Sequence, residues 1–485
     1  MLSARLTDLH PALASSTVGS ELRDMEIRRA SFSSASPPVS STLVPSITET
    51  EPKDPEKGRL PEEGSQEIEE TAHDVVLESE YPRDGGLAGW TCVLGSFFAL
   101  FSTFGWLNSL GLFQTYYEQH LLKAYAPSTI SWIFTTQMFL MWTGGAFFGR
   151  VVDTYGTQVV AIPCTVGCTF SIFMLSFCTS YYQIFLCQGV GFGVSAGGLF
   201  SCATTSVGQW FEKRKALALG TVLAGSSLGG VLHSLYLIIL IQDHGFATAV
   251  RWSSLVVGLT GILACVLMRP RLPKKKWAES TQWIDSCLFK QATFRVYCLG
   301  TFFVVWGLFA PWNYLPSMAL SHGFSNNLAV YTIVVLNAAS IFGRILPAWL
   351  ADRFGRFNSV SLIAFTTALS LLAFWLPTEA AADSSHAQIF AFSAVYGFAS
   401  GAFISVMMPC AADLGPVATL GQRFGTYQAV VGLASLTSLP IQGALIPLDR
   451  GGFTYLIVFS GVCVAVGTVF ICAARMLRVG CALRG

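Results

Sequence analysis

GRILPAWLADRFGR, residues 343–356, is the most informative stretch of this chain. Its first part is apolar enough for the interior of a membrane, whereas its last part places Asp352, Arg353 and Arg356 around Gly355. Glycine permits a tight reversal of the backbone, and charged side chains belong at the boundary between lipid and water. The stretch therefore predicts a transmembrane helix that ends in a short charged turn.

A weaker copy of this stretch, GRVVDTYGT, occupies residues 149–157. It places Asp153 and Gly156 at the spacing found in the first stretch, 199 residues earlier. A second pair of similar stretches, RKALALGT and GQRFGT, places Gly220 and Gly425 in front of threonines, 205 residues apart. Repeats at nearly one interval in a membrane chain predict two similar halves with a binding site between them.

The composition is that of a membrane protein, because 52% of the 485 residues are hydrophobic and only 12% are charged. The 13 cysteines show no metal-like or disulfide-like spacing, and Cys164 and Cys168 lie within an apolar run. The chain contains neither a Walker A motif nor a hydrolytic motif such as HExxH. We therefore predict that the protein is not an enzyme and needs no cofactor, metal or ATP.

The predicted organisation is all-α, with twelve transmembrane helices in two six-helix halves. Residues 1–85 are rich in Ser, Pro and Glu and are predicted to form a disordered cytoplasmic tail. The halves are predicted at 86–268 and 296–476, joined by a cytoplasmic linker at 269–295 and followed by a short cytoplasmic tail at 477–485. The helices are expected near 90–114, 129–149, 157–178, 182–206, 216–240, 249–268, 296–319, 328–348, 359–377, 387–410, 424–446 and 453–475.

Lysine and arginine gather in the even-numbered connections, which include Lys213 to Lys215 and the linker. The positive-inside rule then places both termini and both charged turns in the cytoplasm. We expect a multi-pass protein of the plasma membrane rather than the vacuolar membrane, monomeric and without a nucleic-acid partner.

Several stretches of this chain resemble the major facilitator superfamily, and specifically the fungal type of its monocarboxylate-porter-like branch. The resemblance covers residues 84 to about 476. Its most specific parts are the doubled charged turn, DGGLAGW from Asp84, and WFEKRKALALGTVLAGSSLGG ahead of and within the fifth helix.

The resemblance implies transport by alternating access, in which two halves rock around a central cavity. It also implies a gating role for the turn residues, since a carboxylate near the N-terminus of a facing helix is favoured by roughly 0.3 to 2 kcal/mol. The alternative is that these carboxylates only cap their turns. The predicted gating residues are Asp153, Gly156, Asp352, Arg353, Gly355 and Arg356.

Ionisable side chains inside a membrane are functional candidates, and the predicted interior offers Arg344 and His233. In characterised animal members of the branch, an acidic residue pairs with the arginine and a first-helix lysine contributes to transport. This chain has Ser340 and Asn108 at those positions, which argues against proton symport of a lactate-like acid. Arg344 is expected either to attract an anionic substrate group or to reach back to the interface, and His233 to be a buried hydrogen-bonded residue or a proton carrier.

The other cavity candidates are uncharged and suit a partly apolar organic molecule. We predict a secondary active or facilitative transporter of a small organic metabolite, with protons as an open partner. The substrate classes are an organic acid, a vitamin-like compound or an exported secondary metabolite. The alternative function is a nutrient sensor with a transporter fold. These uncharged candidates are Asn108, Gln114, Gln137, Gln188, Trp306, Trp312, Asn313, Tyr314, Asn337, Tyr396 and Gln428.

Overall fold

The computed structural model describes residues 85–271, 286–380, 385–415 and 420–480. The predicted N-terminal tail up to residue 84, most of the predicted linker and residues 481–485 lie outside these ranges, as does the side chain of Asp153.

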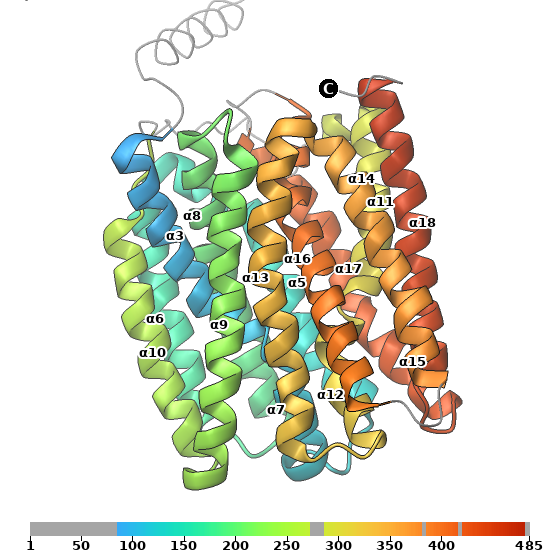
Figure 1. Ribbon diagram of the computed structural model, residues 1–485. Helices are drawn as coiled ribbons and strands as arrows, with labels where there is room; N and C mark the ends of the chain where they lie inside the picture. Colours follow the sequence, from blue (N-terminus) through green and yellow to red (C-terminus); the bar gives the residue numbers. More distant parts are fainter. Residues whose placement is uncertain (1–84, 272–285, 381–384, 416–419, 481–485) are drawn as a thin grey trace, which may run out of the picture. The chain divides into compact units, whose positions relative to one another are not determined.

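Helices account for nearly all of the described residues, and each predicted transmembrane segment coincides with helical structure (Figure 1). In the described ranges there is no strand. The first half of the sequence holds α3 (Gly86–Leu107), α4 (Leu110–Tyr116), η1 (Tyr117–Leu121), α5 (Pro127–Tyr155), α6 (Thr157–Leu175), α7 (Tyr181–Ile184), η2 (Phe185–Phe192), α8 (Gly193–Trp210), α9 (Lys215–His244) and α10 (Phe246–Leu267). The second holds η3 (Ser286–Lys290), α11 (Ala292–Leu308), α12 (Ala310–Ser321), α13 (Asn326–Phe354), α14 (Arg356–Leu369), η4 (Ser370–Trp375), α15 (Leu376–Ala380), α16 (His386–Ala412), α17 (Leu420–Leu448) and α18 (Thr454–Val479).

Eleven helical stretches in the described part of the chain are long and apolar enough to cross a membrane. The remaining predicted segment corresponds to α5, which has 29 residues but is not among the eleven. Its sequence carries the polar run Thr135, Thr136 and Gln137. This helix packs against α8 and α17, so protein covers much of its surface.

Two of the long segments are broken near their middle, which the hydropathy pattern did not predict. The first break falls at Asn108, between α3 and α4, and the second at Phe309, between α11 and α12. The breaks are 201 residues apart, which agrees with the interval of the sequence repeats. Pro311 at the start of α12 lacks a backbone N–H and suits the first turn of a new helix.

Glycine makes both reversals that the sequence predicted. Gly156 joins α5 to α6 with φ 93°, and Gly355 joins α13 to α14 with φ 96°. This left-handed region is open to glycine and strained for other residues. We call the end of the bundle that holds these two junctions the turn end, and the opposite end the far end.

Two long seams join helices from the two parts of the sequence: α9 packs along α13, and α5 packs along α17. Figure 1 shows α9 and α13 side by side along their length. A methyl group at Gly220 would collide with the carbonyl oxygen of Arg344, and one at Gly425 would collide with the backbone of Ala146. The paired glycines of the sequence repeat are therefore points where the backbones of each seam approach closely at the turn end.

Candidate functional site

A cluster of polar side chains lies where α3, α9 and α13 meet, and Arg344 is at its centre. The side chain is 1% exposed, and its Nη1 donates to the carbonyl oxygen of Leu223 at 2.6 Å and to the hydroxyl of Ser226. The amide of Asn108 donates to the carbonyl oxygen of Ser226 at 3.0 Å. The amide of Asn337 donates to the carbonyl oxygen of Asn108 at 3.3 Å. We call Asn108, Ser226, Asn337 and Arg344 the central cluster.

The central cluster carries the guanidinium of Arg344, and no carboxylate of the described residues pairs with it. Among the ion pairs of the described residues, none includes Arg344, and its Nε has no hydrogen-bond partner. A guanidinium removed from water without an anion is costly, so such a residue marks a functional site inside a membrane. The guanidinium fork matches carboxylate and phosphate geometry, so an acidic group is the chemical complement of this site.

His233 is buried on α9, seven residues after Ser226. Its Nδ1 is 2.7 Å from the carbonyl oxygen of Gly229, and its Nε2 has no partner in the described residues. The rings of Phe101, Trp106 and Tyr236 pack around the imidazole. A buried imidazole with one free nitrogen can accept a further hydrogen bond or a proton from a ligand.

Five more of the predicted cavity residues are buried amides with unpartnered atoms in the described part of the chain, and one of them is Gln114, whose Oε1 has no partner. Both amide atoms of Gln137 on α5 and of Asn313 on α12 lack partners. The Oε1 of Gln188 accepts from the hydroxyl of Tyr117 at 2.7 Å, which leaves its nitrogen free. The Oε1 of Gln428 on α17 is also free, and its side chain packs against Gly145. Buried polar groups are normally satisfied, so these amides remain available to a ligand.

Trp306 and Tyr396 lie apart from the central cluster. Trp306 is half-buried on α11, and its indole donates to the hydroxyl of Thr437 at 3.1 Å. Tyr396 is buried on α16, and its hydroxyl donates to the carbonyl oxygen of Leu308 beside the α11–α12 break. Both polar groups are engaged with protein, so we assign them to packing rather than to the central cluster.

The charged turn after α13 holds the N-terminus of α9. The carboxylate of Asp352 accepts from the backbone N–H groups of Ala216 at 3.1 Å and Leu217 at 2.9 Å. Such N–H groups have no partner within their own helix, and the helix dipole favours a negative charge there. Asp352 therefore fastens α13 to α9 at the turn end, as the gating hypothesis requires.

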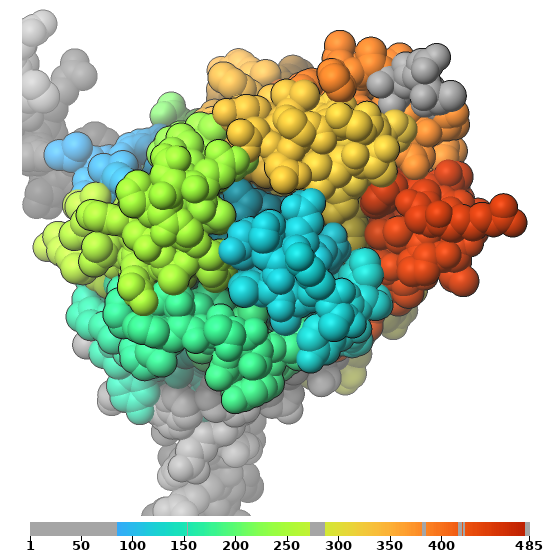
Figure 2. All heavy atoms as spheres, turned by 90° about the horizontal axis from the view of Figure 1, so that it is seen from below, coloured from blue at the N-terminus to red at the C-terminus, as the bar shows by residue number. Residues whose placement is uncertain are grey.

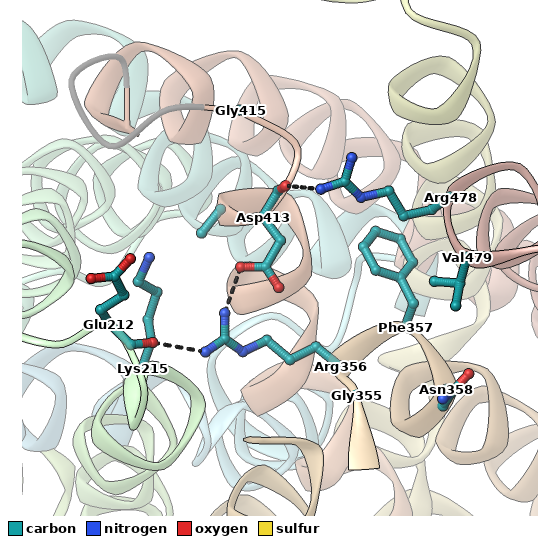
Figure 3. Close-up of a pocket in the computed structure, with 11 residues that line it drawn as sticks. Glu212, Lys215, Gly355, Arg356, Phe357, Asn358, Asp413, Gly415, Arg478 and Val479 are labelled. Carbon is teal, nitrogen blue, oxygen red and sulfur yellow. Dashed lines mark hydrogen bonds and ion pairs between the residues drawn. The ribbon is translucent and has the colours of Figure 1, made fainter. Parts of the chain in front are cut away.

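Arg356 extends this contact to α16. Its guanidinium lies 2.9 Å from the carboxylate of Asp352, pairs with Asp413 and donates to the carbonyl oxygen of Glu212 at 3.1 Å. Figure 3 shows Arg356 between Asp413 and Glu212 at the edge of a cavity of about 660 Å³. We call Asp352, Arg356 and Asp413 the turn-end lock.

The other predicted gating residues contribute differently. The guanidinium of Arg353 stacks on the ring of Trp349, 3.8 Å from the ring centroid. The side chain of Asp153 lies outside the described residues, and Gly156 provides the reversal. At the position of Arg356, the first turn has Thr157, whose hydroxyl is 3.1 Å from the hydroxyl of Ser206.

Sequence reasoning missed two residues of this arrangement. Asp413 has a weak signal, because it is the first acidic residue after the long apolar run of α16. Ser226 has no signal of its own, because it lies in a run of small residues that indicates helix packing. Only the crossing of α9 with α3 and α13 makes it the hub of the central cluster.

The sequence model described as Major Facilitator Superfamily matches residues 87–382. The MFS-type transporter hasB of Aspergillus fumigatus is 40% identical over 413 residues, which cover 82% of this chain and 91% of that protein. The fujikurins efflux protein of Gibberella fujikuroi is 35% identical over 416 residues, with coverage of 84% and 87%. The crystal structure of the human organic anion transporter MFSD10 is similar with a TM-score of 0.61 and 15% identity, covering 79% of this chain and 98% of that one.

Proposed function

Since the chain belongs to the major facilitator superfamily and is a multi-pass membrane transporter rather than an enzyme, we propose that it exports an acidic secondary metabolite of the fungal type. The observation that carries the proposal is Arg344, a buried cation without an anionic partner in the described residues. The name of the fujikurins efflux protein adds the direction of transport, and the sequence likeness extends over most of both chains.

The proposed substrate site is the central cluster together with the unpartnered amides. Arg344 would bind the acidic group of the metabolite in a bidentate manner. The free oxygen of Asn337 and the free atoms of Gln137 and Gln428 would then contact its neutral polar groups. These residues come from both parts of the sequence. If one part rocks against the other, the contacts of a ligand held between them therefore change.

We extend the proposal to the course of transport. Residues 86–268 and 296–476 act as two halves joined by residues 269–295, and the turn end faces the cytoplasm of a plasma-membrane monomer. Lys213, Arg214 and Arg356 at the turn end support this orientation by the positive-inside rule. Opening of the turn end admits the metabolite, and closure of both seams there precedes its release. His233 is the proposed carrier of a coupled proton, because it is a buried imidazole on the helix of Ser226 with one nitrogen that has no partner in the described residues.

The test compares the culture medium of the parent strain, of a strain that carries a deletion of the gene, and of deletion strains that express the wild type, Arg344→Gln or Arg344→Lys. Metabolites that disappear on deletion and return with the wild type define the cargo. We expect Arg344→Gln to restore less than about a tenth of their amount, because loss of a charged hydrogen-bonded contact costs about 1.5 to 3 kcal/mol. Lysine keeps the charge but loses the fork, so Arg344→Lys should restore an intermediate amount.

Surface abundance of each variant is measured in the same cells, so that loss of protein is separated from loss of transport. Flux into inverted vesicles, with and without a pH gradient, tests the proton. Full restoration by Arg344→Gln at equal abundance would refute the assignment of the acidic group to Arg344. An unchanged medium in the deletion strain would refute export.

A further inference from the structure

A second pocket opens at the far end, between the α4–η1 segment, α9 and α13. Its volume is about 360 Å³, within the range of pockets that hold small organic ligands. Figure 2, which views the far end, shows a hollow between the ends of these three elements. The residues that line it are Leu112, Thr115, Tyr116, Gln119, His120, Ile238, Ile241, Gln242, Asn326, Asn327 and Val330. We call it the far-end pocket.

The far-end pocket has an apolar floor and a polar rim. Leu112, Ile238 and Val330 supply aliphatic side chains from all three elements. Amide side chains surround them at the ends of the same elements, and the amide of Gln242 donates to that of Asn327 across the α9–α13 seam. An amphipathic ring system with polar groups along one edge fits this division of surface.

One wall of the pocket is aromatic. The ring of Tyr116 stacks on that of His120 with centroids 4.5 Å apart, and on that of Phe246 at 4.8 Å. The hydroxyl of Thr115 is buried at the pocket without a hydrogen-bond partner in the described residues. A stacked wall and a free hydroxyl are features that bind an unsaturated, oxygenated molecule.

The pocket continues the line of the central cluster. Along α13, seven residues separate Arg344 from Asn337 and seven more separate Asn337 from Val330, so each step rises about 10 Å. Unpartnered polar atoms of the described residues lie on two of these elements: the Nε of Arg344 and the Oδ1 of Asn337 on α13, and the hydroxyl of Thr115 on α4. The α9–α13 seam therefore offers a ligand successive polar contacts from the interior to the far end.

The other seam is shut at this end. The hydroxyl of Tyr314 on α12 is 2.6 Å from that of Ser131 on α5 and 2.9 Å from the carbonyl oxygen of Leu439 on α17. A methyl group at Gly443 would collide with the backbone of Ser128 and with the Tyr314 hydroxyl. These contacts join α5, α12 and α17 directly at the far end.

We propose that the far-end pocket is a release site, where the exported molecule is held after it has left the central cluster and before it leaves the protein. The proposal rests on the proposed export function and adds its exit path, along α4, α9 and α13. It also adds a substrate class: an unsaturated ring system with an acidic group for Arg344 and further oxygen or nitrogen atoms along one edge. The Gln242–Asn327 hydrogen bond spans the outer opening of the far-end pocket and has to break before the molecule leaves.

The first experiment fills the pocket. Ile241→Trp places an indole in the far-end pocket, whereas Ile239→Trp places the same group on the lipid-facing side of α9, where Ile239 is 56% exposed. In the deletion strain, Ile239→Trp should restore the cargo metabolites in the medium to the wild-type amount. Ile241→Trp should restore less than about a fifth at equal surface abundance. Equal restoration by both variants would overturn the release site.

The second experiment does not depend on any metabolite. Thr115→Cys and Ser131→Cys are treated with a membrane-impermeant maleimide on intact cells, and labelling is read on each peptide by mass spectrometry. We expect Thr115→Cys to react at least about fivefold faster than Ser131→Cys, and Gln242→Ala to accelerate labelling of Thr115→Cys further. Faster labelling of Ser131→Cys would overturn the path in favour of the α5–α17 seam.

The two experiments separate the two proposals. If deletion leaves the medium unchanged while Thr115→Cys is labelled as expected, export fails but the outward opening of the pocket stands. If the cargo is exported and Ile241→Trp restores it fully, export stands and the release site fails.

Discussion

The α9–α13 seam and the α5–α17 seam share a close glycine contact near the turn end, and they differ in the contacts around it and at the far end. Each has a glycine pressed against the facing helix near the turn end, at Gly220 and Gly425. On the first seam the turn end is held by the charges of Asp352, Arg356 and Asp413. In the first half of the chain, the position of Arg356 is taken by Thr157, which contacts Ser206 through neutral hydroxyls.

At the far end the difference is reversed. The α9–α13 seam leaves a pocket crossed by one amide hydrogen bond, whereas Tyr314 ties α5 and α17 together. The α9–α13 seam therefore has a charged turn end and an open far end, whereas the α5–α17 seam is tied together at its far end. A transporter built in this way can close its turn end and then release its cargo at the far end of the α9–α13 seam.

The largest effect is expected where Gly220 on α9 lies against the backbone of α13. Gly220→Leu would push an isobutyl group into the carbonyl oxygen of Arg344, and overpacking of this kind costs about 1 to 3 kcal/mol. The α9–α13 seam would stay open at the turn end, and export should fall about tenfold or more. Thr221→Leu, one residue further along and partly exposed, is the matched control. Gly425→Leu should give a similar loss, and wild-type export by either glycine variant would show that its seam need not close.

The next effect comes from the turn-end lock. Asp352→Asn removes the charge that faces the N-terminus of α9, a loss of about 1 to 2 kcal/mol for a partly buried site. The ratio of closed to open turn ends should fall about 5- to 30-fold. The measurement is the rate at which a thiol at the buried position of Ala348→Cys reacts with maleimide in inverted vesicles.

Asp449→Asn is the control for this prediction, because the Asp449 carboxylate accepts from the backbone N–H of Thr454 at the far end, away from the lock. It should leave the labelling of Ala348→Cys unchanged. Equal acceleration by both variants would mean that Asp352 acts on general stability and not on the seam.

A smaller effect is expected at the far end of the α5–α17 seam. Tyr314→Phe removes the hydroxyl that contacts Ser131 and Leu439, with a net cost of about 1 kcal/mol. Labelling of the buried position Thr135→Cys from outside should rise about fivefold. Tyr297→Phe removes a similar buried hydroxyl that binds Met407 between α11 and α16, and should have no effect on this labelling.

The smallest effect is expected from a double variant that gives the turn at Gly156 a charged pair, as the turn at Gly355 already has. Thr157→Arg combined with Ser206→Asp should introduce a charged pair at the position of the neutral contact, worth up to about 1 kcal/mol. Labelling of Val160→Cys, a buried position on α6 that faces α8, should slow by a few fold in the double variant and less in either single variant. A double-mutant cycle without coupling would show that the two charges act separately and not as a pair.

The sequence predicted the twelve helical segments well because apolar length is a local property. It also predicted the reversals at Gly156 and Gly355, since a charged end beside glycine is a local pattern. The helix breaks at Asn108 and Phe309 escaped prediction, because both lie in stretches apolar enough to continue as helix. Only Pro311 offered a local sign of the second break.

The candidate site was predicted in part. Asn108, Asn337 and Arg344 were chosen by residue type and meet in one cluster, whereas Trp306 and Tyr396 were chosen by the same rule and lie elsewhere. Residue type shows that a side chain can bind a ligand, but the rotation of its helix decides which neighbour it faces. The partner of Arg356 was missed for this reason, because Asp413 reaches it only through the packing of α16 on α14.

The amino-acid sequence is enough to show that this protein lies in a membrane, that two pairs of similar stretches recur at nearly one interval, and that an arginine falls inside the predicted interior. These properties depend on composition and spacing, which neighbours in space do not alter. Only the packing of the helices shows that Arg344 has no acidic partner in the described residues, and that the α9–α13 seam has a pocket at the far end where Tyr314 ties the α5–α17 seam. Such properties depend on how helices distant in sequence cross, because a hydrogen bond or an empty space is set by positions to within about an ångström.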